Sequence, residues 1–259
     1  MAIVKFSICT TNYNCAHALE EHLSSVFDAL RNIPFEYLVV DNKSKDGSER
    51  ILRHWESAHS NMHVWVRRCT MGRGRQIAFE RSRGEYIIVL DTDVVYSPAL
   101  ADFLTRYLTR TPELAVQALY CGVFPRALWS EAGGRRSLNT HEDLDMWVRA
   151  SRTGRMRWYP FPLGRNVKEV DASAGQDFLS ARYSRAERVR RLLRRHYDLL
   201  KTRTLSSFDL VAMYEQNLVD FGLGPTFDRW FENRPQLPLL RRCALVVREL
   251  RQAWNGGAH

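Results

Sequence analysis

Short apolar runs alternate with amphipathic stretches over the first 110 residues, and this alternation constrains the fold more than any other feature of the sequence. The period of the apolar residues switches between that of a strand and that of a helix, which predicts a mostly parallel β-sheet flanked by helices. The predicted strands cover residues 3–10, 35–40, 62–66 and 86–90. The predicted helices cover residues 16–31, 74–83 and 100–109, and a further helix starts at 46–48. Ser97 is the predicted cap of the helix 100–109.

Three of the predicted strands end in polar residues, at 10–14, 41–45 and 91–93. The carboxyl ends of parallel strands meet at one edge of a sheet, and ligands of such sheets bind beyond that edge. We therefore expect the three segments to line one crevice.

Asp91-Thr92-Asp93 directly follows the apolar run 86–90. Two carboxylates one residue apart at the end of a buried strand favour a hard divalent cation such as Mg²⁺ or Mn²⁺, which in turn suits a diphosphate. Taken alone, such a motif is usually a polar turn. Its place among the other polar strand ends favours a site for a nucleotide-activated substrate.

The composition indicates an anionic partner and a reducing compartment. The net charge of +9 attracts phosphates, acidic lipids or nucleic acid. The five cysteines form no C-x-x-C pair, so we expect neither a zinc site nor a disulfide framework. No apolar run reaches about 18 residues, and the first strand-like run starts at Ile3, so we expect no transmembrane helix and no signal peptide. We expect a cytoplasmic protein, with peripheral attachment to the inner face of the cell membrane left open.

Five segments share one resemblance. They are Thr11-Asn12-Tyr13-Asn14, residues 39–48, residues 74–87, Asp91-Thr92-Asp93 and residues 141–149. Their residues and order resemble the inverting family 2 glycosyltransferases, over about residues 3–160. The resemblance implies a GT-A fold, a Rossmann-like sheet, and an enzyme that moves a sugar from a nucleoside diphosphate to an acceptor hydroxyl.

The resemblance assigns the donor nucleotide to residues near the first strands. Thr11 and Tyr13 would line the nucleobase pocket, with the tyrosine ring stacked on the base. Asp41 would accept a hydrogen bond from the base, which favours a UDP-sugar and leaves guanosine or thymidine diphosphate open. Arg73 and Arg75 are candidates for the diphosphate, because a guanidinium presents a fork of donors matched to phosphate oxygens.

The same resemblance makes Asp91 and Asp93 the metal ligands, for Mn²⁺ or Mg²⁺. Asp93 would contact the metal directly, and Asp91 would contact the ribose or the metal through water. The family often supplies a further histidine ligand, but residues 164–170 contain none. Lys168 or Arg165 could neutralise the diphosphate instead, so strict metal dependence stays open.

In the resemblance, Asp143 is the general base that deprotonates the acceptor hydroxyl, which then attacks the anomeric carbon from the face opposite the diphosphate. Glu142 would position Asp143 or contact the acceptor. Asp145 is expected to orient Arg149. Trp129 fits either an acceptor pocket or the core.

The carboxyl-terminal third is basic and amphipathic. Arginine-rich helical stretches that start at Ser184 and after Pro238 suit an anionic membrane surface, or packing on the sheet or on a second subunit. The acceptor would be a glycan or a lipid-linked sugar. The predicted units are a GT-A domain at 1–174, divided into a nucleotide-sugar half at 1–110 and an acceptor half at 111–174, and a helical extension at 175–259.

Two other functions stay open at this stage. A non-catalytic basic module that binds membrane or nucleic acid would explain the charge, but not the polar strand ends together with Glu142-Asp143. A nucleotidyltransferase would need a glycine-rich, lysine-bearing loop after the first strand, and residues 10–13 offer none. We expect no nucleic-acid partner, and the oligomeric state is left open.

Overall fold

The computed structural model describes residues 4–139 and 142–167, together with the single residues 186, 190 and 202. The chain divides into two compact units, Met1–Val167 and Lys168–His259. Residues 4–139 and 142–167 belong to the first unit. The basic helices predicted after residue 175, and Lys168, lie outside the described residues.

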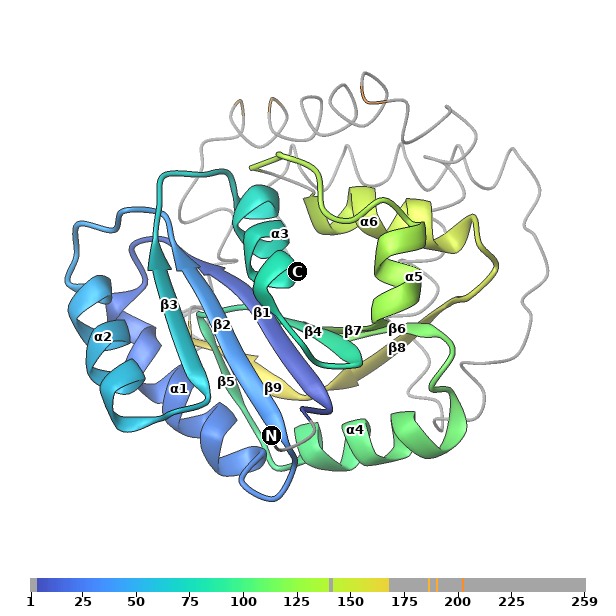
Figure 1. Ribbon diagram of the computed structural model, residues 1–259, viewed down its shortest axis with the longest axis horizontal. Coiled ribbons are helices and arrows are strands. Elements are labelled where there is room, and N and C mark those ends of the chain that lie inside the picture. Colours follow the sequence, from blue (N-terminus) through green and yellow to red (C-terminus); the bar gives the residue numbers. More distant parts are fainter. Residues whose placement is uncertain (1–3, 140–141, 168–185, 187–189, 191–201, 203–259) are drawn as a thin grey trace. The chain divides into compact units, whose positions relative to one another are not determined.

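A seven-stranded sheet of order β3-β2-β1-β4-β7-β6-β8 forms the centre of this unit (Figure 1). The strands of this sheet are β1 (Phe6–Asn12), β2 (Phe35–Asp41), β3 (Met62–Val66), β4 (Tyr86–Leu90), β6 (Ala115–Leu119), β7 (Cys121–Pro125) and β8 (Met156–Pro162). The pairs β1–β2, β2–β3, β1–β4 and β6–β8 are parallel, whereas β7 runs antiparallel to both of its neighbours. The prediction of a mostly parallel sheet is confirmed.

Helices cover both faces of the sheet. They are α1 (Ala16–Ala29), α2 (Ser48–Ala58), α3 (Met71–Arg81), α4 (Ala99–Arg110), α5 (Arg126–Glu131) and α6 (Glu142–Ser151). α1 contacts α2 and α4 on one face, and α3 contacts α6 on the other, where α5 also lies (Figure 1). The predicted helix 74–83 in fact starts at Met71, because the Thr70 side chain caps it by accepting the Arg73 amide at 3.2 Å.

The order of β1, β2 and β4 in the sheet brings the polar strand ends together. The register pairs Asn12 with Asp41 across β1 and β2. β4 lies on the other side of β1, and the Thr10 hydroxyl donates to the Leu90 carbonyl at 2.7 Å. The strand ends that were expected to line one crevice therefore lie side by side.

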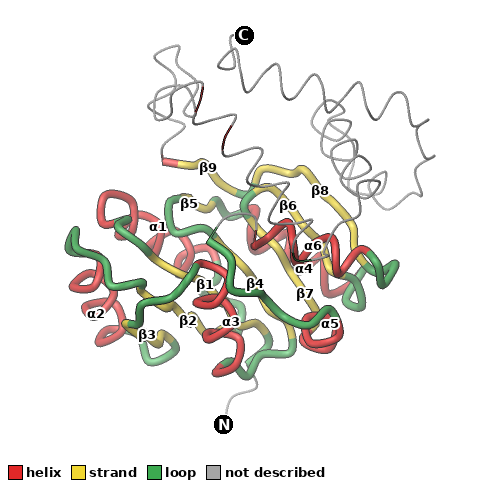
Figure 2. The backbone as a smooth tube through the Cα atoms, turned by 90° about the horizontal axis from the view of Figure 1, so that it is seen from above, coloured by secondary structure: helices red, strands yellow, loops and turns green. Residues whose placement is uncertain are grey.

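The structure contains elements that the sequence pattern did not predict, most of them past Leu114. β6 and β7 form a tight hairpin whose turn residue, Tyr120, has a positive φ of 62°. β5 (Val94–Tyr96) and β9 (Gly164–Asn166) form a separate two-stranded sheet (Figure 2). The predicted cap at Ser97 is wrong: its hydroxyl donates to the Leu163 carbonyl at 3.1 Å, next to β9, and does not cap α4.

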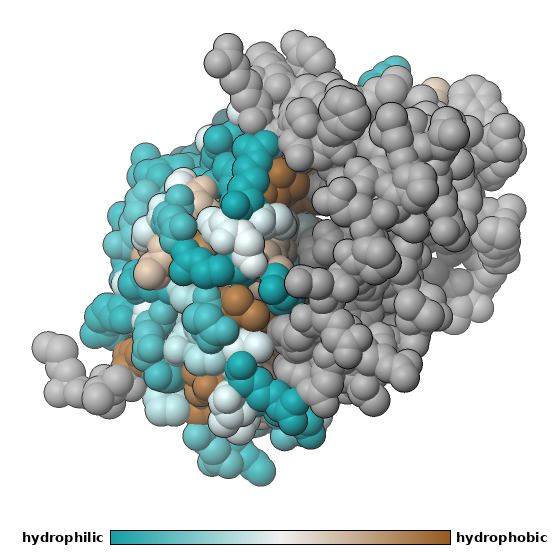
Figure 3. All heavy atoms as spheres, turned by 90° about the vertical axis from the view of Figure 1, so that its right-hand side faces the viewer, coloured by the Kyte–Doolittle hydropathy of each residue, from teal (hydrophilic) through white to brown (hydrophobic). Residues whose placement is uncertain are grey.

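The core of the unit is apolar. The largest fully buried side chains include Trp129, Tyr37 and Tyr107. On the face seen in Figure 3 the visible described residues are mostly hydrophilic, with hydrophobic colour confined to small separate areas. Of the large apolar side chains that the structure describes, Tyr13 (62%) and Met71 (45%) stand out as exposed. In the described part of the chain, none of the helices has the length and apolar character needed to cross a bilayer.

Candidate donor and base site

Asp41 lies at the carboxyl end of β2, fully buried and held by neighbouring polar groups. One carboxylate oxygen accepts from the Asn12 amide at 2.8 Å and from the Ser44 hydroxyl at 2.6 Å, and the other accepts from the Ser44 backbone N–H at 2.8 Å. A carboxylate fixed by three donors has a defined orientation. Asp41 is therefore a hydrogen-bond acceptor with a fixed orientation at the end of β2.

Thr11 and Tyr13 lie beside Asp41 but differ in their surroundings. The Thr11 hydroxyl donates to the Met71 carbonyl at 3.1 Å, which joins the end of β1 to the start of α3. Tyr13 packs little, with 62% of its surface exposed. An exposed aromatic ring next to polar strand ends is suited to stacking on a flat ligand.

The two arginine candidates of α3 have different environments. Arg73 is half-exposed and pairs with Glu80 of the same helix at 2.7 Å. Arg75 is buried, with 5% of its side chain exposed, and pairs with Asp91 at 2.6 Å and with Glu142. Its three neighbouring carboxylates, Glu142, Asp91 and Asp143, raise the pKa of the guanidinium against the opposing effect of burial, which is the largest single influence. Arg75 is thus engaged on both of its terminal nitrogens.

Two glycines of α3 allow the chain to approach this helix closely. The Gly72 amide donates to the Leu138 carbonyl at 3.0 Å, and a Cβ on Gly72 would collide with the Arg136 carbonyl oxygen. A Cβ on Gly74 would collide with the Thr11 methyl group. These glycines serve close packing of α3 against β1 and against the segment 133–139, which we call the strap.

Asp91 and Asp93 follow β4, as predicted, and both are partly buried. Although 44% of the Asp91 side chain is exposed, its removal from water raises the pKa of its carboxyl to about 6. Arg75 opposes this shift, and the negative charge of Asp93 adds to it. A divalent cation would relieve that repulsion.

The donor set fits a divalent metal held jointly by protein and substrate. Within residues 4–139 and 142–167 no cluster of three or more His, Cys, Asp and Glu side chains is placed to hold a metal alone. Mg²⁺ commonly uses one or two carboxylates, waters and substrate phosphates, and Asp91 and Asp93 can supply that number. The Val167 amide donates to the Asp93 carbonyl at 2.9 Å.

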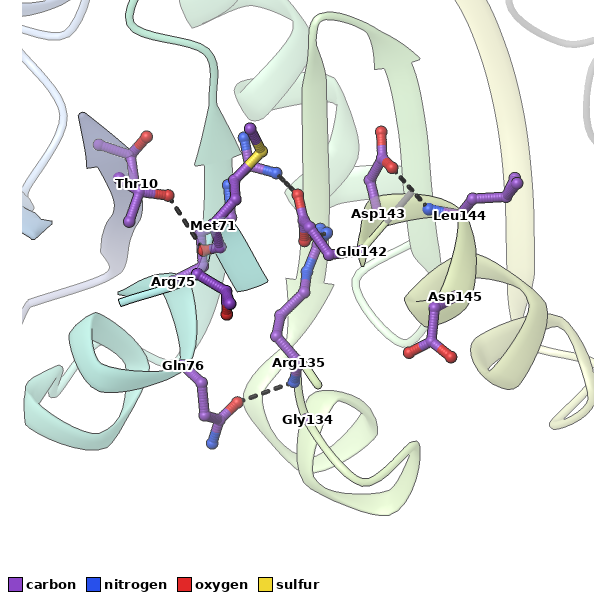
Figure 4. Close-up of polar contacts among 12 residues, drawn as sticks. Thr10, Met71, Arg75, Gln76, Gly134, Arg135, Glu142, Asp143, Leu144 and Asp145 are labelled. Atoms are coloured by element: carbon purple, nitrogen blue, oxygen red, sulfur yellow. Dashed lines mark hydrogen bonds and ion pairs between the residues drawn. The ribbon is translucent and has the colours of Figure 1, made fainter. Parts of the chain in front are cut away.

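Glu142 and Asp143 open α6 and lie in different surroundings (Figure 4). Glu142 is buried, with 1% exposure, between the guanidinium groups of Arg75 and Arg135. Asp143 is half-buried, and one of its oxygens accepts the Leu144 amide at 2.8 Å. Asp143 is therefore the more accessible carboxylate of the pair.

Asp145 and Trp129 lie in the interior of the unit. Asp145 is fully buried and pairs with Arg149 at 2.5 Å, as expected. Arg149 in turn donates to the Gly134 carbonyl at 2.7 Å, which ties α6 to the strap. Trp129 is fully buried and stacks on Phe79, so it belongs to the core.

Three residues of the site were not assigned from the sequence. Asn12 contacts Asp41, and its buried side-chain oxygen has no hydrogen-bond partner among the described residues. Gln76 accepts the Arg135 amide at 2.8 Å and the Trp129 indole N–H at 3.2 Å. Arg135 is 4% exposed and pairs with Glu142. The paired arginines after Gly133-Gly134 were visible in the sequence, but nothing there indicated that one is buried.

Comparison with known proteins shows the family of the chain. The model of the family described as Glycosyl transferase family 2 matches residues 7–162. The chain belongs to this family. It is 29% identical over 124 residues to the dolichol-phosphate mannosyltransferase of Pyrococcus furiosus, and 33% identical over 89 residues to the putative teichuronic acid biosynthesis glycosyltransferase TuaG of Bacillus subtilis. These matches cover 45% and 34% of this chain but only 34% and 35% of the relatives, so the chain aligns with about a third of their length.

Solved structures of other proteins with a similar fold confirm the GT-A architecture predicted for this family 2 chain. A mannosyltransferase from Pyrobaculum calidifontis, solved in complex with GDP-Man and Mn²⁺, has a TM-score of 0.61 at 18% identity, covering 100% of this chain and 74% of the other. S. aureus TarS in complex with UDP-GlcNAc has a TM-score of 0.53 at 17% identity, covering 62% of this chain and 57% of the other. At these identities the likeness concerns the fold.

Proposed function

We propose that this family 2 chain is an inverting, metal-dependent glycosyltransferase that moves a sugar from a nucleoside diphosphate to an acceptor hydroxyl. One observation carries the proposal: a single guanidinium, that of Arg75, contacts both Asp91 after β4 and Glu142 next to Asp143. This contact brings the start of α6, which carries the proposed base, next to the carboxylate proposed for the leaving group, and so supports a single displacement.

In this mechanism the chain's own residues bind, orient and take a proton. Asp41 accepts a hydrogen bond from the base and Tyr13 stacks on it. Asp91 and Asp93 would hold Mn²⁺ or Mg²⁺, which when bound offsets the charge on the departing diphosphate. Asp143 takes the proton of the acceptor hydroxyl as that oxygen attacks the anomeric carbon.

The diphosphate needs cations besides the metal. Arg75 already has two carboxylate partners, so it acts through Asp91 and Glu142 in this arrangement, while the half-exposed Arg73 is free to turn toward phosphate only by giving up Glu80. Lys168 follows Val167, whose amide contacts the Asp93 carbonyl. Lys168 itself lies outside the described residues. It stays the sequence-based candidate for the residue that neutralises the diphosphate.

We favour UDP as the carrier, because the Asp41 carboxylate can accept a hydrogen bond from the N–H of uracil. GDP is the second choice. The two structural neighbours were solved with UDP-GlcNAc and GDP-Man, so both carriers belong in the test. For the acceptor we favour a lipid-linked sugar or glycan at a membrane surface. One relative is named a dolichol-phosphate mannosyltransferase, and the basic stretches after residue 175 would suit anionic lipids.

The test replaces the proposed base. Release of UDP or GDP is followed with UDP-glucose, UDP-GlcNAc and GDP-mannose in MnCl₂, first with water as acceptor and then with a bacterial lipid extract. Asp143→Asn should lower the rate by roughly 100-fold or more, the usual contribution of a general base, with the dissociation constant of the donor unchanged. Asp102→Asn, the same exchange in the first turn of α4 on the opposite face, is the control. Wild-type turnover by Asp143→Asn would refute the assignment.

A further inference from the structure

Arg135 is a buried cation whose side chain points to the first residue of α6. Its side chain is 1% exposed and its guanidinium pairs with Glu142, which precedes the proposed base. A buried arginine is retained only where carboxylates or carbonyls satisfy it, because an unpaired charge in the protein interior is costly. The partner chosen here is the residue adjacent to Asp143.

The strap holds Arg135 in place through its own contacts. The Arg135 amide donates to the Gln76 side chain at 2.8 Å, and its guanidinium lies 5.4 Å from the ring centre of Trp129. Gly134 has a positive φ of 64°, and a Cβ there would collide with Gln76. The backbone of Arg135 is therefore held on the strap by a residue of α3, and its guanidinium extends from there to Glu142 (Figure 4).

Glu142 receives a second guanidinium from the donor side. Arg75 contacts one of its oxygens and Arg135 the other, while Arg75 also reaches Asp91 at 2.6 Å. Asp91, Arg75, Glu142 and Arg135 thus form one chain of alternating charges, which we call the clamp. The clamp runs from the proposed metal carboxylates to the start of α6.

We infer that Arg135 is a positioning residue for the transfer reaction: by holding Glu142 against Arg75, it fixes the distance between the donor site and Asp143. This inference rests on the proposed function. Asp143 must lie within hydrogen-bond reach of the acceptor hydroxyl, and a displacement of about 1 Å can lower a rate about 100-fold. Arg135 itself touches neither substrate.

The first experiment compares Arg135→Met and Arg135→Lys with the wild type, using nucleoside diphosphate release from the sugar nucleotide that the wild type cleaves in MnCl₂. Arg135→Met should lower kcat about 100-fold while the dissociation constant of UDP or GDP, measured by calorimetry, stays within about twofold. Arg135→Lys keeps the charge and should recover about 10-fold of the loss. Arg83→Met is the control. It removes an arginine that pairs at 3.2 Å with the buried Glu36, a carboxylate that also accepts from the Ser7 hydroxyl and the Gly84 amide. This variant should leave kcat unchanged.

A second variant separates positioning from stability. Arg135→Met with Glu142→Gln removes both members of the buried pair, so the stability lost in Arg135→Met should be regained in part, while kcat stays low. If the double variant regains kcat together with stability, or if Arg135→Met has wild-type kcat, the inference is overturned. If Arg135→Met does not fold, Arg135→Lys decides: a kcat equal to that of the wild type overturns the inference, and a loss with unchanged nucleotide affinity supports it.

The proposed function fails in a different way. If the wild type releases no nucleotide from any of the sugar nucleotides, the assignment of the reaction is wrong before the clamp is considered. If the wild type is active, Asp143→Asn is inactive and Arg135→Met is fully active, the reaction stands and only the role of Arg135 falls.

Discussion

At the scale of single residues, glycines shape this site as much as charged residues do, because a glycine allows backbone segments to lie in direct contact. Gly72 lets the strap lie directly on the start of α3, where the Gly72 amide donates to the Leu138 carbonyl at 3.0 Å and the Thr70 hydroxyl meets that of Ser137 at 2.9 Å. Arg135 lies on this strap. The backbone contact at Gly72 therefore sets where the Arg135 guanidinium can reach.

Gly72→Ala should disturb the site through this contact. A Cβ would collide with the backbone oxygen of Arg136, so the strap must move, at a cost of about 1–3 kcal/mol in the free energy of unfolding. The displacement should also lower kcat. Urea unfolding and nucleotide release measure the two effects.

Gly154→Ala is the matched control for that substitution. Gly154 has a positive φ of 71° and open space around it, so alanine there should cost about 1 kcal/mol through backbone strain. It lies in the turn before β8, and kcat should stay at the wild-type value. Equal kcat values for Gly72→Ala and Gly154→Ala would show that the strap does not influence turnover.

At the scale of elements, α1, β2 and β5 are joined by a histidine that the sequence pattern did not single out. His22 lies on the inward face of α1 and is fully buried. Its Nδ1 lies 2.7 Å from the Val94 carbonyl and must donate to it, so its Nε2 accepts from the Tyr37 hydroxyl, also at 2.7 Å. A buried neutral imidazole thus connects the helix to the strand that follows Asp93.

This arrangement predicts a defined dependence of stability on pH. Burial lowers the pKa of His22 to about 4, against the effects of the Val94 carbonyl and Asp93, whereas in the unfolded chain the pKa is about 6.5. Below about pH 6.5 the unfolded state binds a proton that the folded state does not, so stability is lost as the pH falls toward 4. The loss approaches about 3 kcal/mol.

The measurement is urea unfolding between pH 4 and pH 7.5. His22→Gln replaces the imidazole with an amide that does not titrate, and should remove this part of the pH dependence. His54→Gln, at an exposed position of α2, controls for the loss of an imidazole elsewhere. The same slope in wild type and His22→Gln would contradict the prediction.

The elements that the sequence predicted well are those with local signals. Apolar runs such as 86–90 and helical spacing in 16–31 arise from neighbours along the chain, and the strands and helices formed there. The pairing of β5 with β9 joins residues about 70 positions apart, and nothing local indicates it. In the same way, the pair Glu142-Asp143 could be recognised in the sequence. That Arg75 and Arg135 are the partners of Glu142 is visible only in the fold.

At the scale of the whole molecule, the donor site is tested by linkage between binding and folding. A ligand that binds only the folded state at 100 times its dissociation constant adds about 2.7 kcal/mol to the free energy of unfolding. For a chain of this size that corresponds to a rise of about 5–10 °C in Tm. We expect this rise with UDP or GDP in MnCl₂, and a smaller rise in EDTA, because Asp91 and Asp93 would hold the diphosphate only through the metal.

Asp93→Asn makes this measurement specific. The variant should lose the Mn²⁺-dependent part of the rise and keep the part seen in EDTA, since Asp41 and Tyr13 remain to hold the base. Asp102→Asn, on α4 and away from the polar strand ends, should respond as the wild type does. An equal rise in Tm with Mn²⁺ and with EDTA would place the diphosphate away from Asp91 and Asp93. If neither nucleotide raises Tm, the proposal of a donor site at these strand ends is wrong. Since nothing in this measurement depends on the acceptor, it tests the donor half of the site before any acceptor is known.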